Sequence, residues 1–155
     1  MSNADAAASA PRRQGRGSRR SSRELALQAL YQWLLNGDEV QALLTQTAEK
    51  EAFARADQGF FQTLLHGVIE RAPQLEEAVQ PFLDRPVGQL SPIERALLLM
   101  AAYELTVSLD VPYRVVINEA VELAKAYGGT DGYKYVNGVL DKLATQVRPS
   151  EVKKS

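Results

Sequence analysis

The sequence has no cysteine and a single histidine, His66, among its 155 residues. Without cysteine the chain can form neither a disulfide framework nor a thiolate zinc site, and one histidine is too few for a histidine-rich metal site. No uninterrupted apolar run approaches the ~18 residues of a membrane-spanning helix, and the N-terminus lacks the apolar segment of a secretory signal. These absences predict a cytoplasmic protein without a metal, a cofactor or a membrane segment.

Motifs that carry catalysis are also missing. No glycine-rich phosphate loop follows a strand, and there is neither a nucleophile elbow nor a metal-ligand spacing. His66 belongs to an apolar helical stretch, where a hydrogen-bonded structural histidine is the more frequent role. Glu119 and Glu122 fall on the polar face of a predicted helix, which is typical of a solvated surface. The sequence therefore predicts no catalytic residue and a protein that is not an enzyme.

Charge is distributed unevenly, although the net charge is only −1. Residues 1–23 contain six arginines and one aspartate, a net charge of +5, whereas the rest of the chain contains 12 basic and 18 acidic groups, a net charge of −6. A basic arm on an acidic body favours a localised site for a polyanion such as RNA. The acidic body disfavours the alternative of a DNA-binding helical protein.

The basic arm is rich in Ala, Ser, Gly, Arg and Pro. Residues 1–18 have too little apolar surface to form a core, so we expect them to be disordered when unbound. Arg19, Arg20 and Arg23 follow at three- and four-residue spacings, and a helix extending over them would place all three on one side. Guanidinium groups bind phosphate oxygens and stack on bases. The alternative is a solubilising tail.

The hydrophobic pattern from Ser21 onward is helical, without a convincing alternating strand. Asp57 is a candidate N-cap for the helix at 57–69, and Ser91, Pro92 and Glu94 have the positions of a capping box. Residues 96–102 are apolar on every side, which predicts a central buried helix. The expected fold class is all-α with about seven helices, at residues 21–36, 39–49, 57–69, 75–83, from 91 onward, 112–127 and 131–147, and with a flexible tail at 150–155.

Two helices carry features beyond a buried face. On the last helix, Tyr135 falls opposite the apolar positions and is flanked by Lys134 and Lys142. An aromatic ring between lysines is suited to base stacking with phosphate contact, although a surface tyrosine can also simply cover a neighbouring loop. The first helix is apolar over an arc wider than a core-facing helix needs. Tyr31 and Leu35 border its narrow polar strip, so they are the residues that we expect to be exposed to a partner or to a second copy in a homodimer.

The sequence resembles the NusB family of bacterial transcription antitermination factors from about Arg19 to Pro149. The most specific stretches are residues 23–31, 110–113, 117–125 and 134–142. Among these, Asn-Glu-Ala at 118–120 and Val-Asn-Gly-Val-Leu-Asp at 136–141 are together highly distinctive.

The resemblance implies two small helical bundles packed together. It implies binding of the boxA element of nascent RNA jointly with NusE, a ribosomal protein of the small subunit. It further implies recruitment to RNA polymerase with NusA and NusG, and transcription of rRNA operons past terminators. Residues 19–149 would then form one helical RNA-binding domain.

Individual residues can be assigned from the same resemblance. It implies that the NusE surface includes Tyr31 and Glu94, to which the helix pattern adds Leu35. It implies RNA contacts from the arginine-rich arm and from the start of the last helix. The helix pattern adds Lys142, which lies on the polar face of that helix. The expected RNA-binding residues are Arg19, Arg20, Arg23, Asp131, Lys134, Tyr135 and Lys142.

The sequence departs from the family pattern in two places. Ser21 and Ser22 interrupt the arginines, and Phe82 and Gly88 stand where some relatives have Tyr and Glu. Two alternatives accompany the RNA-binding interpretation. One is a helical protein–protein adaptor without intrinsic RNA binding. The other is the NusB-like domain of certain rRNA cytosine methyltransferases, which we disfavour because no Rossmann-like domain is present in the 155 residues.

Overall fold

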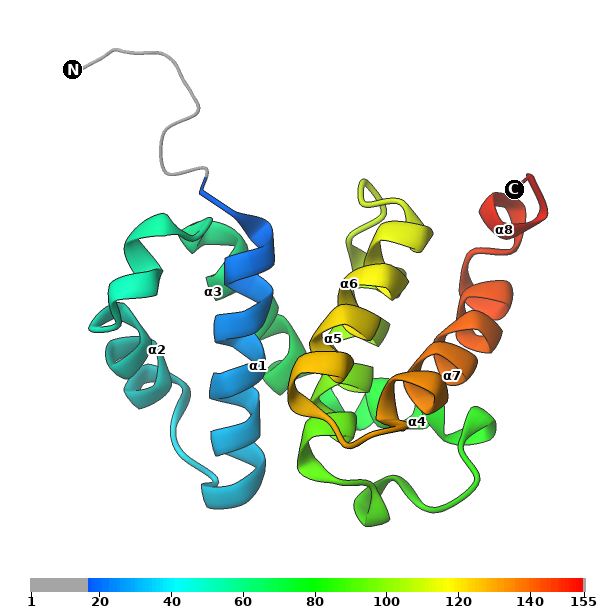
Figure 1. Ribbon diagram of the computed structural model, residues 1–155, viewed down its shortest axis with the longest axis horizontal. Coiled ribbons are helices and arrows are strands. Elements are labelled where there is room, and N and C mark those ends of the chain that lie inside the picture. The colour runs from blue at the N-terminus through cyan, green and yellow to red at the C-terminus, as the bar shows by residue number, and fades with distance from the viewer. Residues whose placement is uncertain (1–16, 155) are drawn as a thin grey trace. The chain divides into compact units, whose positions relative to one another are not determined.

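The computed structural model describes residues 17–154 (Figure 1), which contain eight α-helices, three short 3-10 helices and no strand. The predicted all-α class is confirmed. The chain divides between His66 and Gly67 into two compact units, each of which is described separately below. The expected disorder of the arm concerns residues 1–16, which lie outside the described part of the chain.

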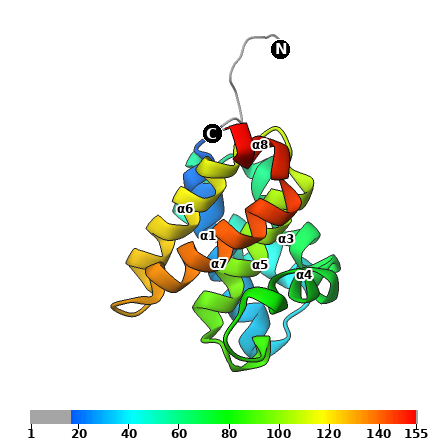
Figure 2. The same cartoon turned by 90° about the vertical axis from the view of Figure 1, so that its right-hand side faces the viewer.

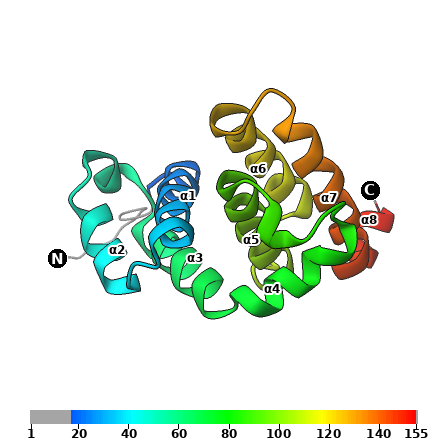
Figure 3. The same ribbon diagram turned by 90° about the horizontal axis from the view of Figure 1, so that it is seen from below.

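The first unit contains α1 (Arg19–Asn36), α2 (Val40–Ala48), the 3-10 helix η1 (Glu51–Arg55) and most of α3 (Gln58–Glu70), as Figure 3 shows from below. Helix α1 contacts α2 and η1. It ends at Gly37, whose φ of 69° lies in the left-handed region that glycine adopts without strain. Helix α3 follows a side-chain cap, in line with the predicted start near residue 57: the Phe60 N–H donates to Oδ1 of Asp57.

The last two residues of the expected arm belong to the fold. The Ser18 N–H donates to the Arg55 carbonyl, and the Asp57 N–H donates to the Ser18 carbonyl. A Cβ added to Gly17 would lie 2.2 Å from the Arg55 carbonyl oxygen, so only glycine fits this approach without a shift. Ser18 also caps α1, because its Oγ accepts from the Ser21 N–H. The expectation that residues 17 and 18 are disordered is therefore wrong, because the Ser18 backbone pairs with Arg55 and Asp57 and Gly17 lies against the Arg55 carbonyl.

The second unit is organised around α5 (Pro92–Val107), which contacts α4 (Ala72–Val79), α6 (Tyr113–Tyr127) and α7 (Gly132–Val147) (Figure 2). Residues 96–105 of α5 are all buried, which confirms the predicted central helix. The cap is also as predicted, since the Glu94 N–H donates to Ser91 Oγ and Pro92 takes the first helical position. Two 3-10 helices, η2 (Gln80–Phe82) and η3 (Val87–Gln89), link α4 to α5.

The chain closes with α8 (Pro149–Lys154), where the sequence pattern predicts a flexible tail. Arg148 precedes it and is only 6% exposed. Its guanidinium donates to main-chain carbonyls at the end of α5 and in the following loop, and to the Glu151 carboxylate. Carbonyls at a helix C-terminus have no partner within the helix, and Arg148 supplies it. The tail prediction is wrong because Pro149 does not end order here but begins a new helix.

Candidate nucleic-acid interface

The arm arginines lie in the first turn and a half of α1, in the first unit. Arg19 and Arg23 both place their guanidinium groups over the ring of Phe60, at 4.2 and 5.0 Å from its centroid. Arg19 Nε also lies 3.5 Å from Oδ2 of Asp57, and its side chain is 46% exposed. Arg20 is exposed. Phe60 and Asp57 thus fix the direction of a basic helix start.

Arg23 differs from its neighbours because it is only 5% exposed. A guanidinium group at this position is held against Phe60 and packs as part of the unit. Contact between Arg23 and RNA stays a prediction, and it requires the side chain to become more exposed than it is here. Arg19 and Arg20 offer accessible cations without that change.

The start of α7 supplies the second group of expected RNA-binding residues, in the second unit. Lys134 and Asp131 are both well exposed, and Lys134 Nζ lies 3.5 Å from Oδ1 of Asp131. Lys142 is exposed two turns further along the helix. The apolar face is as predicted in its centre: Val136, Val139, Leu140 and Leu143 are buried. The periodicity therefore predicts correctly which side of α7 is available to solvent.

Tyr135 is partly exposed and is joined to the loop that follows η2. Its hydroxyl donates to Oδ1 of Asp84 at 3.0 Å and accepts from the Asp84 N–H at 3.2 Å. Arg85 donates from Nε and Nη2 to the two Asp84 oxygens at 2.7 and 3.0 Å, and its guanidinium carbon lies 5.3 Å from the Tyr135 ring centroid. Sequence reasoning missed Asp84 and Arg85, because nothing in the pattern indicates that Asp84 meets a residue 51 positions away.

These contacts change the titration of the cluster. The hydrogen bond from Arg85 and then that from Tyr135 lower the pKa of the Asp84 carboxyl to about 2. Desolvation is the largest cause that raises the pKa of the Tyr135 hydroxyl. At neutral pH the cluster therefore contains a carboxylate, a guanidinium and a neutral phenol, and the orientation of the ring does not depend on pH in the physiological range.

The expected partner-binding residues are divided between the units. Tyr31 and Leu35 on α1 are 38% and 54% exposed, in agreement with the sequence-based expectation of exposure. Glu94 lies in the first turn of α5, and a Cβ added to Gly132 would lie 3.1 Å from Glu94 Oε2. The Glu94 carboxylate therefore faces the start of α7. Within the second unit, the expected NusE contact Glu94 therefore lies next to the expected RNA contacts at the start of α7.

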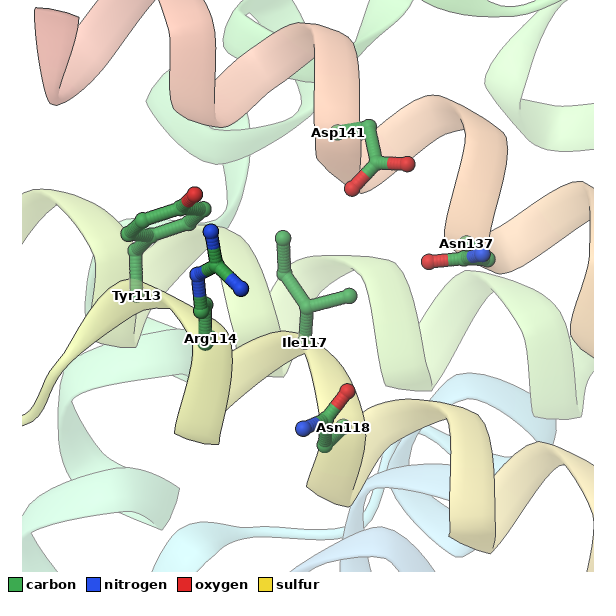
Figure 4. A pocket seen from close by; sticks show the side chains of 6 residues that line it. All are labelled: Tyr113, Arg114, Ile117, Asn118, Asn137 and Asp141. Carbon is green, nitrogen blue, oxygen red and sulfur yellow. The ribbon is translucent and has the colours of Figure 1, made fainter. Parts of the chain in front are cut away.

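A groove of about 220 Å³ is lined by residues of α6 and α7, which pack against each other. Figure 4 shows Asn118 on α6, and Asn137 and Asp141 on α7, directed toward the groove. None of the expected RNA-binding residues lines it. The three residues belong to the segments that carry the family resemblance, so that resemblance includes exposed side chains as well as core positions.

Membrane and metal sites can be assessed for residues 17–154. No helix in this range is long and apolar enough to cross a membrane. No group of three or more His, Cys, Asp or Glu side chains in the described part of the chain is arranged to hold a metal ion.

The chain matches the model of the NusB family over residues 20–145. It belongs to the NusB family. The transcription antitermination protein NusB of Ralstonia pickettii (strain 12J) is 56% identical to it over 150 residues, which cover 97% of this chain and 95% of the relative. NusB proteins such as this relative are transcription antitermination factors and not enzymes.

Solved structures share the fold. NusB of T. maritima superposes with a TM-score of 0.76 at 29% identity, over 89% of this chain and 99% of the other. A crystal structure of the antitermination factors NusB and NusE in complex with dsRNA contains a chain that superposes with a TM-score of 0.71 at 24% identity, over 83% of this chain and 96% of the other. The NusB fold therefore holds for nearly all the described residues.

Proposed function

We propose that this NusB-family protein binds boxA-type RNA jointly with the ribosomal protein NusE. The observation that carries the proposal is the start of α7, where Asp84 holds the partly exposed ring of Tyr135 in place and the preceding residue, Lys134, is exposed. A fixed aromatic ring beside a cation is suited to an unpaired base and its phosphate, because stacking accepts the base and the ammonium group attracts the backbone.

The arm adds a sequence-independent contribution. Arg19 and Arg20 present accessible guanidinium groups, which attract phosphates strongly but do not distinguish bases. Residues 1–16 carry three more arginines, Arg12, Arg13 and Arg16, and these extend the positive charge of the arm. Base selectivity then depends on Tyr135 and its neighbours. The complex of NusB, NusE and dsRNA among the solved structures of this fold supports the same combination of ligands.

NusE would be recognised by exposed apolar residues and a carboxylate. Tyr31 and Leu35 form an exposed pair on α1, and solvent-exposed apolar side chains of this size are suited to a protein interface. Glu94 adds a negative charge in the second unit. In this proposal the complex joins RNA polymerase with NusA and NusG and allows rRNA operons to be read past terminators. Without NusE, the α1 pair could be covered by a second copy in a homodimer.

A titration of fluorescein-labelled boxA-type RNA tests the proposal. Wild-type protein is added with and without the NusE ribosomal protein, and a scrambled RNA of equal length is the control. The expected result is selective binding that NusE strengthens. If the chain is instead an adaptor, it binds NusE in a pull-down but neither RNA at any salt concentration, and the proposal is then wrong.

A further inference from the structure

The loop between η2 and η3 is fixed on both sides of Asp84 and Arg85. Gln80 donates from Nε2 to the Arg85 carbonyl and accepts from the Val87 N–H on Oε1, both at 3.0 Å. Tyr135 binds both the N–H and the carboxylate of Asp84. These hydrogen bonds hold a short exposed loop against the first turn of α7, so its side chains are oriented before any ligand arrives.

Arg85 retains binding capacity in this arrangement. A guanidinium group has five N–H donors, and two of those of Arg85 are used on Asp84. The other three have no partner among the described residues, and the side chain is 44% exposed. Since guanidinium groups bind phosphate oxygens through pairs of donors, Arg85 combines free donors with a fixed position at the Tyr135 ring.

We propose that Asp84 and Arg85 belong to the RNA site: Arg85 contacts a phosphate of the nucleotide that stacks on Tyr135, and Asp84 positions both side chains. The inference rests on the proposed RNA-binding function and extends its site from α7 onto this loop. Arg85 is then a direct contact, whereas Asp84 and the Tyr135 hydroxyl act through the orientation of the ring and the guanidinium. A surface ion pair between adjacent residues, without a role in binding, is the alternative that the experiment must exclude.

The second unit offers a matched control for Arg85. Arg114 on α6 is also an exposed arginine beside a tyrosine, with its guanidinium carbon 5.7 Å from the Tyr113 ring. It lies outside the proposed site. Arg114→Ala removes the same charge and a similar ring contact from the same unit, so a difference between the two variants reports on position and not on net charge.

The experiment measures boxA-type RNA affinity, as a function of salt, for wild type, Arg85→Ala and Arg114→Ala in the presence of NusE. We expect Arg85→Ala to weaken binding about tenfold, as for the removal of one charged hydrogen bond. Its slope of log affinity against log salt should also become shallower by about 0.7–0.9. Arg114→Ala should change affinity less than about twofold. Equal effects of the two variants overturn the assignment of Arg85.

Tyr135→Phe tests the positioning by Asp84, since it removes the hydroxyl but keeps the ring and changes no charge. We expect RNA affinity to fall about threefold, as for the removal of one neutral hydrogen bond, while the salt slope and the thermal midpoint stay as in wild type. Unchanged affinity overturns the role of Asp84. Wild-type protein that binds no RNA contradicts the proposed function itself, whereas wild-type binding with silent variants contradicts only this inference.

Discussion

The Tyr135 hydroxyl and the Asp84 carboxylate meet at 3.0 Å although the two residues are 51 positions apart in the sequence. The contact joins the first turn of α7 to the loop after η2, and Arg85 covers the ring from the same loop. A side chain that sequence patterns place on an open polar face is thereby given a defined orientation. The Tyr135 ring is therefore oriented before any RNA binds.

Tyr135→Ala should weaken binding of boxA-type RNA by ~1–3 kcal/mol, the usual loss for one stacked base. Tyr31→Ala is the reciprocal control, because Tyr31 is assigned to NusE and not to RNA. Isothermal titration with each ligand separately should show that Tyr135→Ala affects RNA alone and Tyr31→Ala affects NusE alone. Loss of both ligands in either variant would contradict the division of roles between these two residues.

The accessible arm arginines should govern the salt dependence of RNA binding. In the double variant Arg19→Ala, Arg20→Ala, the slope of log affinity against log salt should become shallower by about 0.7–0.9 for each phosphate that the arm no longer neutralises. Lys50→Ala removes an exposed cation of the same unit outside the arm and should leave the slope unchanged. The arm hypothesis fails if the double variant and Lys50→Ala give the same slope.

Arg148→Ala should reduce the free energy of unfolding by about 3 kcal/mol, since it removes the guanidinium that donates to four main-chain carbonyls at the end of α5 and in the following loop. Arg148→Lys should recover only part of the stability, because an ammonium group cannot reach carbonyls spread around a planar guanidinium. Urea denaturation measures both, with the exposed Lys153→Ala as control. A decrease below about 1 kcal/mol in Arg148→Ala would show that these hydrogen bonds are dispensable for stability.

Glu151 should make stability depend on pH in the acid range. Its pKa is lowered by hydrogen bonds from Arg148 first and from the Tyr113 N–H second. A carboxyl whose folded pKa is below its unfolded value, about 4.3, stabilises the fold above that pH and stops doing so as the pH falls through the folded pKa. The difference in thermal midpoint between wild type and Glu151→Gln should therefore be constant near neutrality and shrink below about pH 4. A constant difference throughout the acid range would contradict this linkage.

Local signals in the sequence predict much of this fold. Asp57 and Ser91 are the expected helix caps and accept the expected N–H groups, because capping depends on neighbours within three residues. The exposure of Tyr31 and Leu35 likewise follows from the helical period.

What the sequence does not predict depends on residues distant in the chain. The burial of Arg23 requires the ring of Phe60 on another helix. The order of α8 requires main-chain carbonyls that Arg148 reaches across 43 positions at Leu105 and 37 positions at Val111. Neither relationship leaves a periodic or local signal, so both emerge only from the packing of the helices.

The candidate site shows the same division. Lys134 and Lys142 are exposed on α7 as the periodicity predicts, and Asp131, which the family resemblance implies as an RNA contact, is exposed just before the helix. Asp84 and Arg85 could not be predicted, because a short polar loop carries no periodic signal and its position beside Tyr135 results from the packing of α7 against α4 and η2. Sequence patterns therefore predict which α7 residues are exposed to solvent. The structure adds Asp84 and Arg85, the residues that orient Tyr135.

The central claim is that the chain binds boxA-type RNA selectively and jointly with NusE. The most direct measurement is the affinity of wild-type protein for boxA-type and scrambled RNA of equal length, at one fixed salt concentration, with and without NusE. The account predicts tighter binding of the boxA-type RNA and a further gain when NusE is present. Equal affinity for both RNAs, with no effect of NusE, would contradict it.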